Sequence, residues 1–467
     1  KELPGQIELT LGCKEKMQRF ANRYLAARDV FFIGRGIDYA ISMEGSLKLK
    51  EISYIHSEAY AGGELKHGTI ALIEEGTLVT AILTQEDLYK KTISNVQEVR
   101  TRGAFVMAVT NVGNVDLEKI ADYYHLDKEK IVLFGANVNP LGLSGQVKKD
   151  LAEHLDIISS YPDRDYTDLK KAIAAYTNTS PEHIVVGNGS TELISLLISQ
   201  RAPKRALLLG PTYSEYAREL NLVGGTLEYY NLKEEQDFRL DISDLTDTLK
   251  SDIDLLIICN PNNPTSSAIS TADMKKLLTV CRSLGIFVMI DETYIEFAPE
   301  GTSLSAVSLV PEFDNFMVIR GVSKFFAAPG LRFGYGLTSN QAFLQTLLTH
   351  QNPWSLNSIG AYAGERMLKD TDYIQKTWSL IDSERTRMCT ELSGLDTVKI
   401  YPAYANFVLV KILKEGLTSF DVFEKAIHQN FMIRDCSSFE SLNGEYVRFC
   451  IMNPEDNDRL LDVFRSL

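Results

Sequence analysis

The chain has few cysteines, only two tryptophans and a shortage of positive charge for its 467 residues. Its six cysteines show no Cys-x-x-Cys spacing, which argues against a disulfide framework or a zinc motif. Lys and Arg number 48 against 62 Asp and Glu, and the net charge of −14 argues against nucleic acid and anionic membranes as partners. No apolar stretch reaches the length of a membrane span, and we expect no secretory signal. We therefore predict a cytoplasmic protein with reduced thiols and no metal.

Apolar runs and amphipathic segments alternate along most of the chain, which predicts parallel βαβ units. Hydrophobic residues make up 45% of the sequence, enough for ordinary α/β cores. Before residue 127 we predict strands over Asp29–Ile33, Leu78–Leu83 and Ala104–Thr110, and helices over Ile37–Ile52, Gln85–Thr101 and Asp116–Tyr124. After it we predict strands over Ile184–Val186, Arg205–Leu209, Leu255–Cys259, Phe287–Ile290 and Met317–Arg320, and a strand-rich end with an interposed helix over Val398–Ile412 and Met432–Met452.

The change of pattern near residue 127 predicts two domains, residues 1–127 and 128–467. Within the second we expect a large α/β domain over about 166–358, and a small α+β domain built from 128–165 and 359–467. No polar linker rich in glycine or proline separates the two halves. The junction is therefore either a tight fusion or a joining of halves that did not belong together in nature.

Lys324 is the most informative residue, because a lysine in this stretch is placed to form an imine with an aldehyde cofactor. Ser323 and Arg332 flank it with a hydroxyl and a fixed positive charge, which suit a phosphate. Asp291 follows the apolar run Ile286–Ile290, which predicts a buried strand. A carboxylate at that strand end can pair with a protonated pyridine nitrogen, although a helix N-cap is the alternative. Together these features describe pyridoxal 5'-phosphate (PLP) chemistry.

Further residues at predicted strand ends fit the same cofactor. Ser190 and Thr191 lie in a glycine-containing turn that opens a helix, where backbone N–H groups favour a phosphate; a plain turn is the alternative. Tyr213 can stack on a pyridine ring or simply fill the core. Asn263 and Tyr294 can both hydrogen-bond the phenolic oxygen of the cofactor and so tune its proton affinity. The alternative for the Asn-Pro cluster around Asn263 is a turn.

Two arginines near the C-terminus predict anion binding. Arg448 lies within the apolar run Tyr446–Ile451, and a buried arginine needs an anionic partner. A substrate carboxylate held by two hydrogen bonds fits, with an internal salt bridge as the alternative. Arg434 can meet a second substrate anion, but Asp435 beside it offers a local pairing.

From about Val132 to its end, the chain resembles the fold-type I PLP enzymes of aminotransferase class I/II. It is most similar to the branch that contains histidinol-phosphate aminotransferase and L-threonine-O-3-phosphate decarboxylase. The resemblance covers roughly three quarters of the chain, and its motifs are specific to that branch. They are Asn137-Val138-Asn139-Pro140-Leu141-Gly142, Tyr161-Pro162-Asp163, Asn263-Pro264-Thr265, Ser323-Lys324 and Arg434-Asp435-Cys436.

The resemblance implies a role for each matched residue. Lys324 would bind the cofactor and move the proton, and Asp291 would keep the ring nitrogen protonated. Asn263 and Tyr294 would bind the phenolate, and Tyr213 would stack on the ring. The phosphate would be held by Ser190, Thr191, Ser323 and Arg332, with Tyr161 reaching across from the second subunit of a homodimer. Substrate would meet Asn139, Arg434 and Arg448.

The same resemblance leaves two reactions open, because the bond perpendicular to the cofactor ring decides the outcome and the sequence does not reveal it. Residues 139–142 and 352–357 favour the decarboxylase. The glycine-rich arm that precedes Asn137 in such decarboxylases is absent. We therefore favour an aminotransferase that acts on a small phosphorylated amino compound with a keto-acid partner, and keep the decarboxylase as the alternative.

The first half offers a second candidate site. Glu44, Lys48 and Glu51 are spaced to share one helix face, where a carboxylate beside an ammonium could move a proton between sugar carbons. A solvated charged face is the alternative. With Gly34-Arg35-Gly36 and the stretches 47–55 and 63–68, this half resembles the second SIS (sugar isomerase) subdomain of glutamine–fructose-6-phosphate aminotransferase. That likeness implies Glu51 as the enolising base, Lys48 beside it, and His67 as the ring-opening residue.

Parts of the sugar isomerase are missing from this half. The residues of this half show no counterpart of the phosphate loop of the first SIS subdomain, the glutaminase domain or the closing tail, and we expect it to act without them. We therefore predict an SIS-like parallel α/β domain that binds sugar phosphate poorly and does not isomerise it. The competing interpretation is a regulatory module that senses sugar phosphate for the PLP domain.

Overall fold

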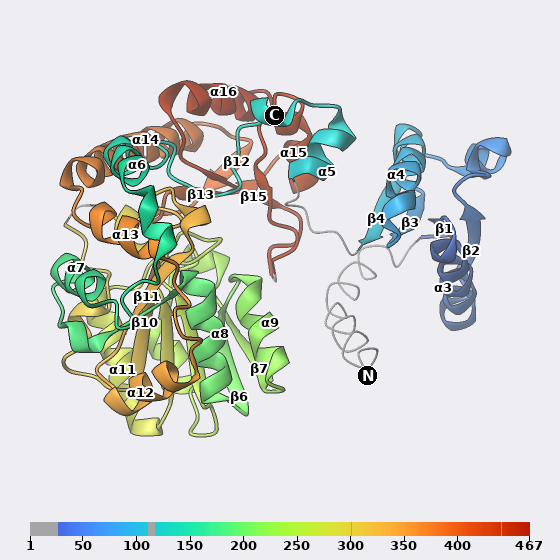
Figure 1. Ribbon diagram of the computed structural model, residues 1–467. Coiled ribbons are helices and arrows are strands. Elements are labelled where there is room, and N and C mark those ends of the chain that lie inside the picture. The colour runs from blue at the N-terminus through green and yellow to red at the C-terminus, as the bar shows by residue number, and fades with distance from the viewer. Residues whose placement is uncertain (1–26, 111–116, 300, 440) are drawn as a thin grey trace. The chain divides into compact units, whose positions relative to one another are not determined.

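The computed structural model describes residues 27–110, 117–299, 301–439 and 441–467 (Figure 1). Cys13 and Asp116, which figure in the sequence predictions, lie outside these ranges. The chain forms two compact units, Lys1–Lys128 and Glu129–Leu467. In the part of the chain that the structure describes, no helix has both the length and the apolarity needed to cross a membrane.

The first unit contains a four-stranded parallel sheet in the order β2-β1-β3-β4. Strand β3 is buried along its whole length, as expected for a central strand with helices on both faces. The core beneath it includes Phe31, Ile33, Val79 and Ala81. The elements are β1 (Asp29–Gly34), α3 (Ile37–Ser53), β2 (His56–Ala61), β3 (Leu78–Leu83), α4 (Glu86–Thr101), β4 (Phe105–Thr110) and α5 (Leu117–Tyr124).

The large lobe of the second unit is built on a seven-stranded sheet in the order β5-β11-β10-β9-β8-β6-β7. All neighbours pair in parallel except β11, which runs antiparallel to both β5 and β10. The strands are β5 (Ile184–Asn188), β6 (Arg205–Gly210), β7 (Thr226–Asn231), β8 (Leu255–Cys259), β9 (Phe287–Asp291), β10 (Phe316–Gly321) and β11 (Phe333–Leu337). Helices α8 (Gly189–Arg201), α9 (Ser214–Leu222), α10 (Ile242–Thr248), α11 (Thr271–Leu284) and α12 (Gln341–His350) accompany this sheet (Figure 1).

The small lobe is built on a four-stranded antiparallel sheet in the order β12-β13-β15-β14. Its strands are β12 (Val398–Ile400), β13 (Phe407–Ile412), β14 (Arg434–Asp435) and β15 (Tyr446–Cys450), and its helices include α14 (Thr371–Ser393), α15 (Ser419–Ile427) and α16 (Pro454–Arg465). Three further helices of the second unit are α6 (Gly145–Glu153), α7 (Thr167–Thr177) and α13 (Ser358–Met367).

The carboxyl ends of the central strands meet at one edge of the large sheet. Cys259 and Asp291 are register partners at the ends of β8 and β9, and Asp291 is also the register partner of Ile319, near the end of β10. Lys324 follows five residues after Ile319, in the loop that leads to β11. Since ligands of open α/β sheets bind outside the carboxyl ends of the strands, this edge is where the predicted site is expected.

Candidate active site

Lys324 reaches out of the loop after β10 with its side chain partly buried. Its Nζ donates a hydrogen bond of 2.8 Å to the backbone oxygen of Ala136. Burial and the nearby positive charge of Arg448 lower the pKa of Lys324 to about 8. About a tenth of the amine is therefore neutral at pH 7, far more than for an ordinary lysine, and the neutral amine is the form that acts as a nucleophile.

Asp291 ends β9 and is 4% exposed. Its Oδ1 accepts hydrogen bonds from the backbone N–H of Thr293 at 2.9 Å and from the hydroxyl of Thr293 at 2.6 Å. Its Oδ2 accepts from the hydroxyl of Tyr216 at 2.6 Å. Burial raises the pKa of Asp291 although these hydrogen bonds oppose the rise. No cation in the described chain contacts it, so a protonated ring nitrogen would supply the charge partner that a buried carboxylate needs.

The start of helix α8 and Arg332 form a cradle of positive potential. Gly189 has φ of +80°, and a Cβ placed there would lie 2.5 Å from the guanidinium of Arg332. Ser190 and Thr191 occupy the first turn of this 13-residue helix, which has no side-chain cap. A Cβ at Gly334 would collide with the backbone nitrogen of Ser190. This close approach of backbone, helix N-terminus and arginine fits a phosphate group.

Tyr213 lies within electrostatic reach of both Asp291 and Arg332. Burial raises its pKa, and the charges of Glu215, Asp291 and Arg332 also act on it. The residue is 37% exposed, and its ring meets the ring of Tyr216 edge to face at 5.6 Å. A partly exposed ring near both the carboxylate and the guanidinium is suited to stack on a planar phosphorylated cofactor.

Polar groups of the two lobes meet beside Lys324 and leave several atoms without partners. Asn137 donates through Nδ2 to the hydroxyl of Tyr294 at 3.3 Å. Arg448 donates to Oδ1 of Asn263 and, at 2.8 Å, to the backbone oxygen of Gly135. Oδ1 of Asn137 and Nε of Arg448 are buried without a hydrogen-bond partner. Because buried polar groups are normally satisfied, these atoms are suited to ligand contacts.

Arg434 and Arg448 are register partners on β14 and β15. Arg434 donates to the hydroxyl of Ser438 at 2.8 Å, and its Nη1 is buried without a partner. Burial and the charge of Arg448 lower the pKa of Arg434. Neither arginine forms a salt bridge with a carboxylate of the described chain, and Asp435 is instead bonded by the hydroxyls of Ser419 and Ser437. The local pairing of Arg434 with Asp435 is therefore not formed, and two adjacent cations favour an anionic ligand.

Two other predicted residues have different surroundings. The amide of Asn139 donates to the backbone oxygen of Phe325 at 2.8 Å, Tyr373 at 3.0 Å and Thr377 at 2.9 Å, so its N–H groups are used inside the protein. Its backbone N–H also donates to the oxygen of Lys324 at 3.1 Å, which fixes the lysine loop. Tyr161 is 79% exposed and packs on Trp354 at 4.8 Å, outside the cluster around Lys324.

The predicted isomerase residues of the first unit are solvent-exposed. Nζ of Lys48 lies 2.8 Å from Oε2 of Glu51 and 3.7 Å from Oε1 of Glu44 on helix α3. All three side chains are at least half exposed. His67 is exposed at the end of the short helix Leu65–His67. This arrangement has the character of a solvated charged face.

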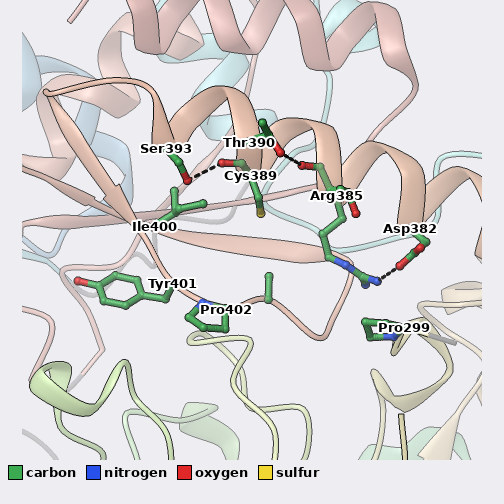
Figure 2. A pocket seen from close by; sticks show the side chains of 11 residues that line it. Pro299, Asp382, Arg385, Cys389, Thr390, Ser393, Ile400, Tyr401 and Pro402 are labelled. Atoms are coloured by element: carbon green, nitrogen blue, oxygen red, sulfur yellow. Dashed lines mark hydrogen bonds and ion pairs between the residues drawn. The ribbon is translucent and has the colours of Figure 1, made fainter. Parts of the chain in front are cut away.

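A groove of about 660 Å³ lies on the small lobe between α14 and the loop after β12 (Figure 2). It is lined by Arg385, Thr390, Ser393 and Tyr401, among others, and by none of the predicted site residues. Arg385 is held by Asp382 at 2.6 Å, and the hydroxyls of Thr390 and Ser393 bond their own helix. The groove also contains the free thiol of Cys389, but it holds neither the lysine nor the carboxylate that the predicted chemistry needs, and both of these lie at the sheet edge.

The lowered pKa of Lys324 predicts how cofactor-free protein should capture PLP. Since only the neutral amine attacks a carbonyl, the capture rate should rise with pH and level off above about 8, and fall about tenfold per unit below it. Stopped-flow absorbance across pH 6 to 9.5 measures this; Arg448→Met should move the midpoint to higher pH. A rate independent of pH in that window contradicts the prediction.

The fold, the lysine loop and the anion cradle define a PLP-dependent enzyme of fold type I. The family model for aminotransferase class I and II matches residues 129–464, and that for the SIS domain matches residues 24–136. The chain therefore belongs to the aminotransferase class I and II family and carries an SIS domain at its N-terminus. The predicted membership of aminotransferase class I and II and the predicted SIS domain are confirmed.

The similar proteins include both of the predicted kinds of enzyme. The chain is 32% identical to a threonine-phosphate decarboxylase of Salmonella typhimurium, over 75% of this chain and 95% of the relative. It is 29% identical to a histidinol-phosphate aminotransferase of Methanococcus aeolicus, over 75% and 93%. The crystal structure of the histidinol-phosphate aminotransferase from Clostridium acetobutylicum is 30% identical, covers 72% of this chain and 98% of its own, and has a TM-score of 0.67.

Proposed function

We propose that the chain is a PLP-dependent aminotransferase acting on a small phosphorylated amino compound. The observation that carries the proposal is that two groups lie at the same edge of the large sheet. One is Lys324, whose pKa is lowered, and the other is Asp291, a buried carboxylate that no cation of the described chain contacts. PLP supplies an electron-withdrawing ring that stabilises negative charge on the substrate carbon bonded to nitrogen. Residues 128–467 form the domain that would do this work, with residues 1–127 as the SIS domain.

The residues of the chain would divide the work by position. Lys324 would bind the cofactor carbonyl and afterwards move a proton at the substrate carbon, for which an amine with a pKa near 8 is suited. Asp291 would hold the ring nitrogen protonated, and Tyr213 would stack on the ring. Tyr294 and Asn263 would bind the phenolic oxygen. Ser190, Thr191, Ser323 and Arg332 would hold the phosphate.

The adjacent arginines would select the substrate by charge. Arg448 has a buried Nε and Arg434 a buried Nη1 without partners, so each can donate to a substrate oxygen. A substrate with one anionic group at each arginine would offset two buried positive charges. Asn139 would act here by fixing the lysine loop, which borders the same space.

We further propose a homodimer in the cytoplasm. Leu155, Ile158, Tyr161 and Trp354 are 52%, 63%, 79% and 41% exposed, and exposed apolar side chains of this size favour a protein interface. Tyr161 would then reach the cofactor phosphate of the second subunit. The five cysteines in the described ranges are free thiols, which supports a reducing compartment.

A second candidate is decarboxylation of threonine phosphate. It is favoured by the 32% identity to the Salmonella typhimurium decarboxylase. Both reactions need the same lysine, carboxylate and phosphate cradle. They differ in whether a C–H or a C–carboxylate bond stands perpendicular to the cofactor ring.

A product assay separates the two reactions. Holoenzyme is incubated with histidinol phosphate plus 2-oxoglutarate, and separately with L-threonine O-3-phosphate. Glutamate formation without carbon dioxide supports the aminotransferase. Carbon dioxide from threonine phosphate without glutamate formation overturns it in favour of the decarboxylase, and the absence of both products overturns both. Lys324→Ala serves as the blank for each substrate.

The SIS half is expected to be inactive as an isomerase. Lys48 and Glu51 are at least half exposed and paired with each other, whereas an enolising base must be desolvated against its substrate. Intact wild-type protein should convert fructose 6-phosphate no faster than the Glu51→Gln variant does, as measured by a coupled glucose 6-phosphate assay. Conversion that depends on Glu51 contradicts this expectation. A change of PLP-domain turnover on adding the sugar would instead support the regulatory alternative.

A further inference from the structure

Glu234 joins the two lobes of the PLP domain through one carboxylate. It lies in the short helix Glu234–Gln236 after β7, at the edge of the large sheet. Its Oε1 accepts from Lys399 Nζ at 3.3 Å and from the Tyr401 hydroxyl at 2.8 Å. Its Oε2 accepts from Lys411 Nζ at 2.7 Å and from the Tyr446 hydroxyl at 2.9 Å. All four donors belong to the small lobe.

The surroundings of Glu234 make this contact stronger than an ordinary surface ion pair. Its side chain is 27% exposed, and that of Lys411 is 21% exposed. Burial opposes its ionisation, but hydrogen bonds from Lys411, Tyr401 and Tyr446 lower the pKa of Glu234 to about 2. Phe238 follows this short helix, and its ring packs edge-on against the rings of Tyr401 and Tyr446, with centroid distances of 5.0 and 6.0 Å. A carboxylate that accepts four hydrogen bonds beside packed aromatic rings stabilises the contact between the lobes more than an isolated, exposed ion pair would.

The strand held by Glu234 is the strand that presents Arg448. Tyr446 and Arg448 are two positions apart on β15, so their side chains project from the same face, roughly 7 Å apart. Lys411 is the register partner of Tyr446 on β13, which places both donors to Oε2 side by side. Arg448 itself donates to Asn263 of the large lobe. Strand β15 therefore meets the large lobe at two neighbouring points, one of them at the proposed substrate site.

We propose that Glu234 is a positioning residue that sets the distance between Arg448 and the large lobe, and so the affinity for anionic substrate. This rests on the proposed function in one respect, namely that Arg448 binds the substrate anion. Without the carboxylate, the hydrogen bonds of Tyr446 and Lys411 to the large lobe are lost, and Arg448 keeps its hydrogen bond to Asn263. The arginine can then shift with its strand. A misplacement of about 1 Å at a binding group is enough to be measured.

The test compares Glu234→Gln with Glu228→Gln in the full-length holoenzyme. Glu228 lies on β7 of the same lobe and is 41% exposed, but its ion pair is with Arg205 of β6, so its loss leaves the lobes joined. The probe is succinate, a dicarboxylate without an amino group, with its dissociation constant measured by calorimetry. We expect about tenfold weaker binding for Glu234→Gln, equivalent to about 1.4 kcal/mol, and a change under about twofold for Glu228→Gln.

Two more readouts separate positioning from general stability. In an Arg448→Met background, Glu234→Gln should no longer change succinate affinity, because its effect passes through the arginine. Amide hydrogen exchange should quicken in β15 and β13 but not in β8 or β9. With substrate, KM should rise about tenfold while kcat stays within about twofold. If Glu234→Gln unfolds, Tyr446→Phe and Lys411→Met replace it and should each give a smaller shift in the same direction.

Equal succinate affinity in Glu234→Gln and wild type, or an affinity loss that persists without Arg448, overturns the proposal. These outcomes are independent of the reaction catalysed. If neither product forms although succinate binds normally, the proposed function is refuted, and the role of Glu234 in positioning Arg448 can still be tested with succinate. If the wild type does not bind succinate at all, the proposed role of Arg448 in anion binding is refuted, and this inference is refuted with it.

Discussion

Lys324→Ala should lower kcat by at least about 10³-fold and remove covalent attachment of PLP, because this amine would both bind the cofactor and transfer the proton. The fold should survive, since the hydrogen bond that the Lys324 side chain makes within the described chain goes to the backbone oxygen of Ala136, and the backbone bonds of the residue remain. Borohydride reduction of wild-type holoenzyme followed by peptide mass spectrometry should locate the label on Lys324. The same treatment of the variant should leave no labelled peptide.

Lys170→Met is the matched control for that variant. Lys170 is also partly buried, and burial lowers its pKa, but it lies on helix α7 away from the strand ends. Its replacement should keep turnover within about twofold of wild type, because the charges that act on it are those of Asp165 and Asp163 and not those of the proposed cofactor site. A labelled peptide containing Lys170, or activity retained in Lys324→Ala, would show that another amine binds the cofactor.

The strands were predictable from sequence where burial on both faces gives an unbroken apolar run. Leu78–Leu83 and Leu255–Cys259 match β3 and β8 to the residue. The predicted strand Phe287–Ile290 differs from β9 only by the terminal Asp291. Central strands of parallel sheets can be recognised from their sequence, because helices cover both faces and most side chains of the strand are therefore apolar.

Three strands were missed, each for a physical reason. β2 and β7 lie at sheet edges and are half exposed, so their sequences mix polar and apolar residues without a clear period. β11 reads Phe-Gly-Tyr-Gly-Leu, and its glycines are required by packing, since a Cβ at Gly336 would collide with Met317. Glycine at such a close approach weakens the strand signal that the local sequence carries.

The strand-end position of Asp291 was predictable, but its contacts were not. The run Ile286–Ile290 places a carboxylate at the edge of the sheet, yet nothing local indicates that Tyr216, 75 residues earlier, donates to it. Likewise the unpartnered atoms of Asn137 and Arg448 exist only because the two lobes meet. Local sequence therefore predicts which chemical groups reach the sheet edge, and tertiary contacts decide which of them remain available to a ligand.

Asp291→Asn should lower kcat by about 10²–10³-fold, because a neutral amide cannot keep the ring nitrogen of the cofactor protonated. Cofactor-free protein should respond in the opposite sense and become more stable. The pKa of Asp291 is raised in the folded state, so the stability of the wild type falls as the pH rises from the ordinary aspartate pKa to the raised one, and stays at the lower level above it. The gain in melting temperature of Asp291→Asn over wild type should therefore grow with pH across that window and then level off, as differential scanning calorimetry of both proteins without PLP would measure.

Asp254→Asn provides the comparison at the opposite end of the same sheet. Asp254 precedes β8 and accepts from the backbone N–H groups of Lys204 and Arg205 at 2.7 and 3.0 Å, so its loss should reduce stability and leave kcat unchanged. Tyr216→Phe should fall between wild type and Asp291→Asn in kcat, since it removes one donor and keeps the carboxylate. Wild-type turnover in Asp291→Asn, or a melting temperature lowered at every pH, would mean that this carboxylate serves the fold and not the cofactor.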